Sequence, residues 1–135
     1  MHYPYISQKP ADEAETFTAL IDLARYLRTP DGCPWDREQN SKKFAMFHKE
    51  EGQEMIDAFE EGDDALEEEF GDCLFTLLAM VAAAEEEGRF TLESAMRRSL
   101  KKMIRRHDHV FGEKKAATAE EAVAAWDKVK AEEKG

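Results

Sequence analysis

The chain has 135 residues, of which 30 are Asp or Glu and 19 are Lys or Arg, and its net charge at pH 7 is −11. This length predicts one domain, and so acidic a surface argues against nonspecific binding to nucleic acid. Two cysteines far apart in the sequence, Cys33 and Cys73, form no disulfide framework and are typical of a reducing cytoplasm. The first residues lack the apolar run of a signal peptide, and the apolar segment 73–84 is too short to span a membrane, so we expect a cytoplasmic protein without membrane contacts.

An extended N-terminal arm is expected over residues 1–11, because prolines and little periodicity occur there, and its candidate packing residues are Tyr3 and Tyr5. Apolar residues recur at helical spacing through most of residues 12–135, which we interpret as a single helical domain. The expected helices are 12–28, 41–61, 64–87, 91–106 and 119–133. Because no strand pattern occurs, the prediction is an all-α fold, a bundle of four or five helices.

The loop after the first helix carries the sequence Cys33-Pro34-Trp35-Asp36. A tryptophan in a loop usually caps an edge of the core, but it could also stack on a base, and both interpretations stay open. No histidine stands near either cysteine in the sequence to activate it, which favours inert thiols.

Two acidic clusters lie on neighbouring predicted helices: Glu50, Glu51 and Glu54 on the first, and Glu69 and Asp72 on the second. Residues three or four apart share one face of a helix, so an antiparallel hairpin would bring four or five of these carboxylates together. Crowded carboxylates repel one another unless a cation or protons lie between them. An all-oxygen cluster suits a hard cation, so the spacing predicts a site for Mg²⁺ or Mn²⁺.

The alternative is that these carboxylates are ordinary surface charges of an acidic chain. Acidic runs at 60–61, 85–87, 120–121 and 132–133 are interpreted as solvated faces, with Glu86 as an expected silent control. Asp72 differs because twelve uncharged residues follow it, which favours its partial burial, and buried carboxylates are usually paired or bound to metal.

The expected turn between the two acidic helices is Gly62-Asp63-Asp64, with Asp63 or Asp64 as the N-cap. The apolar positions interpreted as core in these two helices include Phe59 and Phe70. Together, the turn and the apolar positions predict two antiparallel helices joined by a short connection.

Basic residues recur every four positions on helix 91–106, in pairs ending with Arg105 and Arg106. For Arg97 and Lys101 we favour a solvated face paired with acidic neighbours. The residues Lys102, Arg105 and Arg106, nearer the end of the helix, could instead hold phosphates.

The segment after this helix contains His107 and His109, which either cap the C-terminus of the helix or bind metal. Capping is the favoured interpretation. Thr118 and Glu121 form a capping box for the last helix, which also carries Trp126. No P-loop, glycine-rich dinucleotide turn or serine elbow occurs in the sequence.

Five motifs follow one another along the chain: Cys33-Pro34-Trp35-Asp36, Glu50-Glu51-x-x-Glu54, Glu69-x-x-Asp72, Arg105-Arg106-His107-x-His109-Val110-Phe111-Gly112 and Trp126-x-x-Val129-Lys130. In this order they resemble MazG, one of the all-α nucleoside triphosphate pyrophosphohydrolases, over about residues 17–133. The resemblance implies hydrolysis of a nucleoside triphosphate between its α and β phosphates, giving the monophosphate and pyrophosphate. Removal of noncanonical nucleotides is a candidate role.

The resemblance also implies which acidic residues would be functional. Glu51, Glu54, Glu69 and Asp72 would bind Mg²⁺, with Mn²⁺ as the other candidate metal. Glu50 would support these ligands or orient the attacking water. The bound metal would neutralise phosphate charge and activate water.

On the basic side, the resemblance implies that Lys102 and Arg106 grip the phosphates and stabilise the charge that develops during transfer, with Arg105 beside them. Trp126 and Lys130 would contact the nucleotide. The family further implies a homodimer, or a tetramer of paired dimers.

Two other functions stay open from the sequence. One is a nucleotide-binding or regulatory module that has the fold without turnover. The other is a purely structural acidic bundle, whose stability Mg²⁺ would not change.

Overall fold

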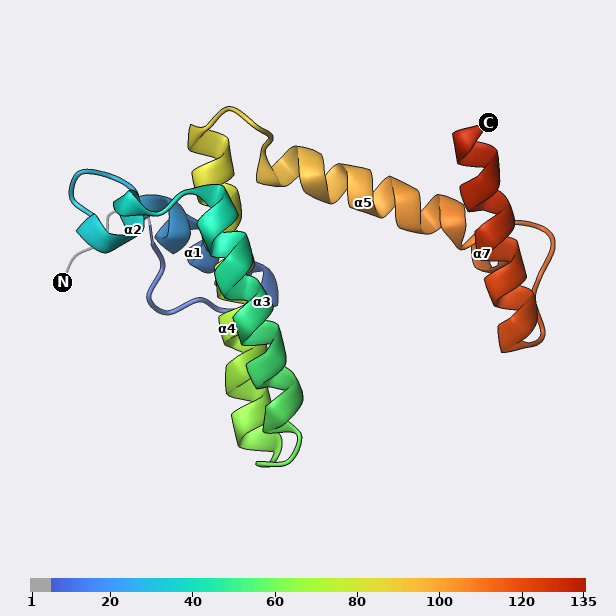
Figure 1. The fold of residues 1–135 in the computed structure, drawn as a ribbon, viewed down its shortest axis with the longest axis horizontal. Coiled ribbons are helices and arrows are strands. Elements are labelled where there is room, and N and C mark those ends of the chain that lie inside the picture. The colour runs from blue at the N-terminus through green and yellow to red at the C-terminus, as the bar shows by residue number, and fades with distance from the viewer. Residues whose placement is uncertain (1–5) are drawn as a thin grey trace. The chain divides into compact units, whose positions relative to one another are not determined.

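The structure, a computed structural model, describes residues 6–135, so the packing expected of Tyr3 and Tyr5 lies outside the described residues. Residues 6–135 fold into seven α-helices without a strand (Figure 1), which confirms the all-α prediction but not the expected number of four or five helices, because α2 and α6 are additional short helices. These helices form two compact units, one ending at Leu92 and the other spanning Glu93–Gly135. The single domain expected over residues 12–135 stays a prediction.

The first unit contains four helices: α1 (Glu13–Tyr26), α2 (Pro34–Glu38), α3 (Ser41–Ala58) and α4 (Asp63–Glu86). Local side chains support their first turns. The Asp12 carboxylate accepts a hydrogen bond from the backbone N–H of Glu15 at 2.9 Å, and the Asn40 side chain caps α3 in the same way. The short helix α2 replaces part of the expected loop, because Pro34 at its first position already has a helical φ.

Helices α3 and α4 lie side by side as an antiparallel hairpin (Figure 1), as the sequence predicts. The turn between them differs from the prediction. Gly62 is the N-cap of α4, with a φ of 111° that favours glycine, and no side chain caps the helix. Asp63 and Asp64 are instead the first two residues of α4, where their negative charge meets the positive end of the helix dipole.

The core of the first unit is built on the apolar segment of α4, which confirms residues 73–84 as a core helix. Ile21 of α1 and Phe44 of α3 are buried against it. The buried residues of α4 are Cys73, Leu78, Ala79, Val81, Ala82, Ala83 and Ala84. Phe59 and Phe70, expected in the core, are 68% and 60% exposed, because the hairpin extends past α1 at its far end (Figure 1).

The remaining helices are α5 (Leu92–Arg106), the one-turn helix α6 (Asp108–Phe111) and α7 (Ala119–Lys134). The expected capping box begins α7. The Thr118 hydroxyl accepts from the N–H of Glu121 at 3.1 Å, and the Glu121 carboxylate accepts from the N–H of Ala117 at 2.8 Å. His107 ends α5 by donating from Nδ1 to the carbonyl of Met103 at 2.6 Å, as the capping interpretation predicts.

Helix α5 has no buried residue. Its apolar residues Met96, Leu100 and Ile104 are exposed, and their spacing of four residues puts them along one stripe of the helix. No helix within residues 6–135 is long and apolar enough to cross a membrane.

Candidate functional site

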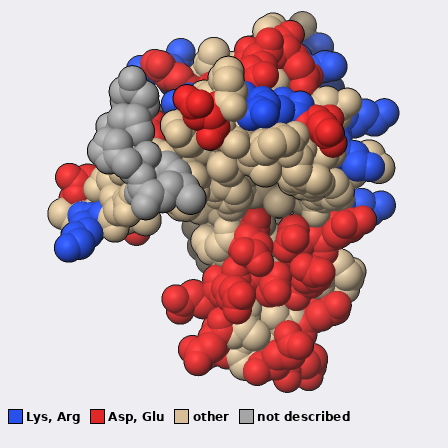
Figure 2. Space-filling view, turned by 90° about the vertical axis from the view of Figure 1, so that its left-hand side faces the viewer, with Lys and Arg blue, Asp and Glu red and all other residues tan. Residues whose placement is uncertain are grey.

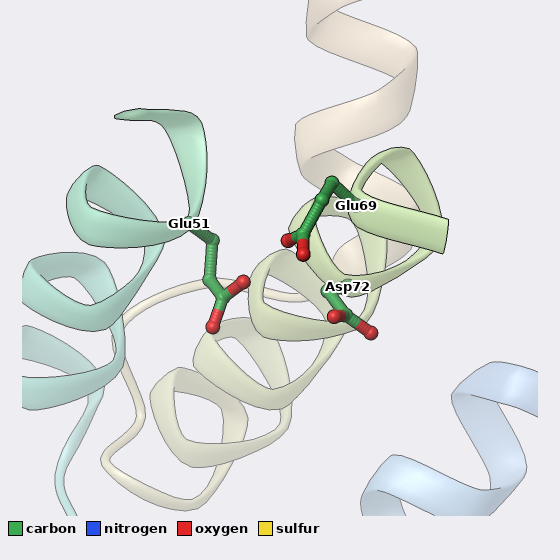
Figure 3. Close-up of side chains that lie close together, drawn as sticks. All are labelled: Glu51, Glu69 and Asp72. Atoms are coloured by element: carbon green, nitrogen blue, oxygen red, sulfur yellow. The ribbon is translucent and has the colours of Figure 1, made fainter. Parts of the chain in front are cut away.

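Three carboxylates from two helices meet in the α3–α4 hairpin. Glu51 extends from α3 towards Glu69 and Asp72 of α4 (Figure 3), and one oxygen of each lies within 4.8 Å of the others. Glu69 and Asp72 share a face of α4 because they are three residues apart. The hairpin therefore brings together three of the four or five carboxylates that the sequence predicts to converge, while their roles stay predictions. Asp72 is exposed, so the partial burial that the sequence favours for it is wrong.

Burial and repulsion between neighbouring carboxylates both affect the pKa of Glu51. Burial raises its pKa most, and the neighbouring carboxyl of Glu54 raises it further by hydrogen bonding and charge. With the charges of Asp72 and Glu69 added, the pKa of Glu51 reaches about 6. Burial, followed by the charges of Glu54 and Asp72, also raises the pKa of Glu69. The predicted ligand Glu54 thus acts on the cluster electrostatically, while Glu50 is exposed beside it in the chain.

Two oxygens of this cluster, Glu51 Oε2 and Glu69 Oε2, are buried and have no hydrogen-bond partner among residues 6–135. A buried carboxylate oxygen without a partner costs free energy, which a cation between the two helices would recover. The donor set is all oxygen, and hard divalent cations such as Mg²⁺ prefer oxygen ligands. The residues therefore fit the metal that the sequence predicts.

The surroundings of the cluster are strongly acidic. Figure 2 shows Asp and Glu side chains covering the far end of the α3–α4 hairpin. Such a surface repels a nucleotide unless cations neutralise it, so a divalent metal is needed if an anionic substrate is to approach the cluster.

A polar contact that the sequence did not suggest joins the hairpin next to the cluster. The Thr76 hydroxyl donates to the carbonyl of Cys73 at 2.9 Å, so it accepts from His48 Nδ1, which lies 3.3 Å away. His48 precedes Glu51 by one turn of α3. Burial raises the pKa of the Cys73 thiol, which agrees with the inert cysteine expected there.

Trp35 of α2 stacks on Phe47 of α3, with ring centroids 5.8 Å apart and an interplanar angle of 19°. The indole also meets the edge of Phe44, yet it remains 54% exposed. Capping of the core edge is therefore observed, while a free part of the ring leaves the base-stacking interpretation open. Buried Arg28 holds α2 in place by donating to Asp36 Oδ1 at 3.1 Å and to the Asp36 carbonyl at 2.8 Å.

The acidic run at 85–87 is not the solvated face that the sequence suggested. Glu85 accepts two hydrogen bonds from Arg25, Glu86 pairs with Arg28, and Glu87 accepts from the N–H and hydroxyl of Ser41. These carboxylates fasten the C-terminal end of α4 to α1 and to the start of α3. Glu86 is therefore unsuitable as a silent control, whereas Glu60 is exposed and makes no side-chain hydrogen bond or ion pair among the described residues.

Basic residues gather with the tryptophan of α7 in the unit Glu93–Gly135. The Arg106 guanidinium lies over the Trp126 ring, 5.2 Å from its centroid, and His107 meets that ring edge-on at 5.3 Å. Lys102 is half-buried one turn before Arg106, and Lys130 is exposed one turn after Trp126. The unit thus brings Arg106 against Trp126, whereas no hydrogen bond, ion pair or ring contact among the described residues joins Lys102 or Lys130 to them.

Glu133 joins this group, although the sequence suggested only a solvated face for residues 132–133. Its carboxylate accepts from Arg106 Nη2 at 2.8 Å and from Arg105 Nε at 2.5 Å. The hydrogen bonds from both arginines lower the pKa of Glu133 to about 2. No sequence signal reveals this pairing, because 28 residues separate Arg105 from Glu133.

A hollow of about 350 Å³ lies beside Trp126, lined by His107, His109, Ala122 and Val123. It is mostly apolar, and Nδ1 of His109 is buried without a partner among the described residues. A flat aromatic ring such as a nucleobase could be accommodated there.

The sequence model of the MazG nucleotide pyrophosphohydrolase domain matches residues 39–111, which is more than half of the chain. The chain belongs to the MazG family. The matched segment contains the α3–α4 hairpin and all three converging carboxylates, and it continues through α5 and α6.

Curated relatives support the assignment of the chain to the MazG family. The nucleoside triphosphate pyrophosphohydrolase/pyrophosphatase MazG of Thermotoga maritima is 38% identical over 120 residues, covering 88% of this chain and 46% of that protein. The nucleoside triphosphate pyrophosphohydrolase of Escherichia coli K12 is 38% identical over 117 residues, covering 85% of this chain and 44% of that protein. The chain thus spans slightly less than half the length of these relatives.

A solved structure shares the fold. The crystal structure of a MazG-related protein from Thermotoga maritima has a TM-score of 0.70 and 31% sequence identity to this chain. The match covers 83% of this chain and 96% of that one.

Proposed function

We propose that this MazG domain hydrolyses nucleoside triphosphates to the monophosphate and pyrophosphate, with Mg²⁺ bound by Glu51, Glu54, Glu69 and Asp72. The observation that carries the proposal is the pair of buried, unpartnered oxygens, one from α3 and one from α4, that face a shared volume. MazG proteins typically depend on Mg²⁺, and Mn²⁺ would suit the same oxygen ligands.

Held there, Mg²⁺ would supply charge neutralisation for the α and β phosphates and a lowered pKa for a bound water. The protein residues would position the metal and the attacking water. Glu51 and the α4 carboxylates hold the ligand geometry across the hairpin, and Glu50, exposed beside them, orients the attacking water. The contact between His48 and Thr76 keeps α3 and α4 in register next to the cluster.

Phosphate binding is assigned to the basic residues of α5. Lys102, Arg105 and Arg106 would stabilise the charge that develops on the phosphates during transfer. Trp126, with the hollow beside it, and Lys130 would contact the nucleotide. Support comes from the guanidinium of Arg106 lying over Trp126, which places one of the proposed phosphate residues against one of the proposed nucleotide residues.

The protein is proposed to act as a homodimer or as a pair of dimers in the cytoplasm. Met96, Leu100 and Ile104 form an exposed apolar stripe on α5, and a second copy would remove such a stripe from water. Both cysteines are free, which fits a reducing compartment.

The test is pyrophosphate release from each nucleoside triphosphate in the presence of Mg²⁺. Asp72→Asn should lower turnover by orders of magnitude, because it removes one ligand charge and keeps the shape. Glu60→Gln on the same hairpin makes the same change outside the cluster and should be silent. Binding of nucleotides without pyrophosphate release would favour the regulatory module, and full turnover of Asp72→Asn would refute the assignment of the cluster.

A further inference from the structure

One carboxylate holds both arginines at the end of α5. Glu133 Oε1 accepts from Arg106 Nη2 at 2.8 Å and from Arg106 Nε at 3.2 Å, while Oε2 accepts from Arg105 Nε. The Glu133 side chain is 21% exposed and the Arg106 side chain 14% exposed, so the contact with Arg106 is largely shielded from water, whereas the Arg105 side chain is 51% exposed. A shielded, bidentate contact of this kind restrains the orientation of a guanidinium as well as its position.

The donors that remain free all lie at the outer ends of the two guanidiniums. Each guanidinium has five N–H donors in one plane. Among the described residues, Arg105 donates only from Nε, and Arg106 only from Nε and Nη2. The Arg106 guanidinium also lies over the Trp126 ring, 5.2 Å from its centroid, so a second contact restrains it besides Glu133. The N–H groups on both Nη atoms of Arg105, those on Nη1 of Arg106 and the second N–H of Arg106 Nη2 are left to meet an anion.

We propose that Glu133 is a positioning residue that holds Arg105 and Arg106 side by side, with their outer nitrogens free, as a preformed receptor for the polyphosphate of the substrate. The inference rests on the proposed function, which assigns these arginines to the phosphates. Long arginine side chains lose rotamer freedom when they bind an anion, and a carboxylate that orders them beforehand reduces that loss.

Charge and orientation predict opposite results when this carboxylate is neutralised. A negative charge next to two arginines opposes an incoming phosphate, so charge alone predicts tighter phosphate binding in Glu133→Gln. A positioning role of Glu133 predicts weaker phosphate binding, because the amide keeps the shape of the side chain but holds the two guanidiniums less firmly. The sign of the change therefore separates a residue that positions the arginines from one that only competes with phosphate.

The experiment measures binding of pyrophosphate with Mg²⁺ to the full chain by calorimetry, together with KM and kcat for the preferred triphosphate. Glu133→Gln should raise both the pyrophosphate Kd and KM by about tenfold, with a smaller effect on kcat. Glu132→Gln is the matched control, because this neighbouring carboxylate is exposed and makes no side-chain hydrogen bond or ion pair among the described residues, although it lines a hollow with Arg105 and Glu133. Glu133→Asp, which keeps the charge on a shorter side chain, should fall between wild type and Glu133→Gln.

Tighter pyrophosphate binding in Glu133→Gln, or binding equal to that of Glu132→Gln, would overturn the inference. So would loss of helical circular dichroism in Glu133→Gln, since the carboxylate would then only fasten α7 to α5. Arg105→Ala and Arg106→Ala separate this from the proposed function. If neither variant weakens pyrophosphate binding, the phosphate assignment of the proposed function fails; if both do and Glu133→Gln does not, only the positioning role fails.

Discussion

Neutralising Glu51 should change how the stability of the metal-free protein depends on pH. The pKa of Glu51 is about 6, against 4.5 for an ordinary glutamate. Because the folded pKa is raised above the unfolded one, the stabilisation by the protonated group is fully present below pH 4.5 and is lost as pH rises through 6. Each pKa unit corresponds to about 1.4 kcal/mol, so the upper limit is about 2 kcal/mol. Screening at a partly exposed site reduces the expected loss to about 1 kcal/mol.

The assay is urea unfolding in EDTA at pH 4 and pH 7.5, compared between wild type and Glu51→Gln. Between pH 4 and pH 7.5, wild type should lose about 1 kcal/mol more stability than Glu51→Gln, because the amide cannot ionise. Glu60→Gln should behave as wild type. Mg²⁺ should then stabilise wild type by mass action and the Glu51 variant much less. A Glu51→Gln protein that is less stable than wild type at pH 7.5 in EDTA would refute the reasoning, because it would show a structural carboxylate.

Three further predictions concern binding, stability and assembly. Trp126→Ala should weaken nucleotide binding, measured by calorimetry, while the helical circular dichroism is unchanged; an insoluble variant would show a core residue instead. Arg28→Met should lower the free energy of unfolding in urea by about 3 kcal/mol, because it leaves the buried carboxylate of Asp36 without its partner; a loss below 1 kcal/mol would show that water compensates for Arg28. Light scattering at micromolar concentration should give at least a dimer, and a monodisperse species of 15.5 kDa would contradict the proposed assembly.

Local features of the sequence determined the helices and half of the candidate metal site. Apolar spacing and the capping box at Thr118 identified α7, because both depend on residues within one or two turns of each other. The same proximity put Glu69 and Asp72 on one face of α4. The family and the all-α fold were likewise accessible, since they rest on short motifs in a fixed order and on helical periodicity.

Tertiary structure decided which charged residues have partners. Whether Glu50 or Glu51 approaches α4 depends on the rotation of α3 within the hairpin, which spacing on one helix does not specify. Glu86 and Glu133 read as solvated charges in the sequence, yet each pairs with an arginine at least 27 residues away. The physical reason is that a helix repeats its own geometry from residue to residue, whereas an ion pair between helices exists only after packing has brought their side chains together.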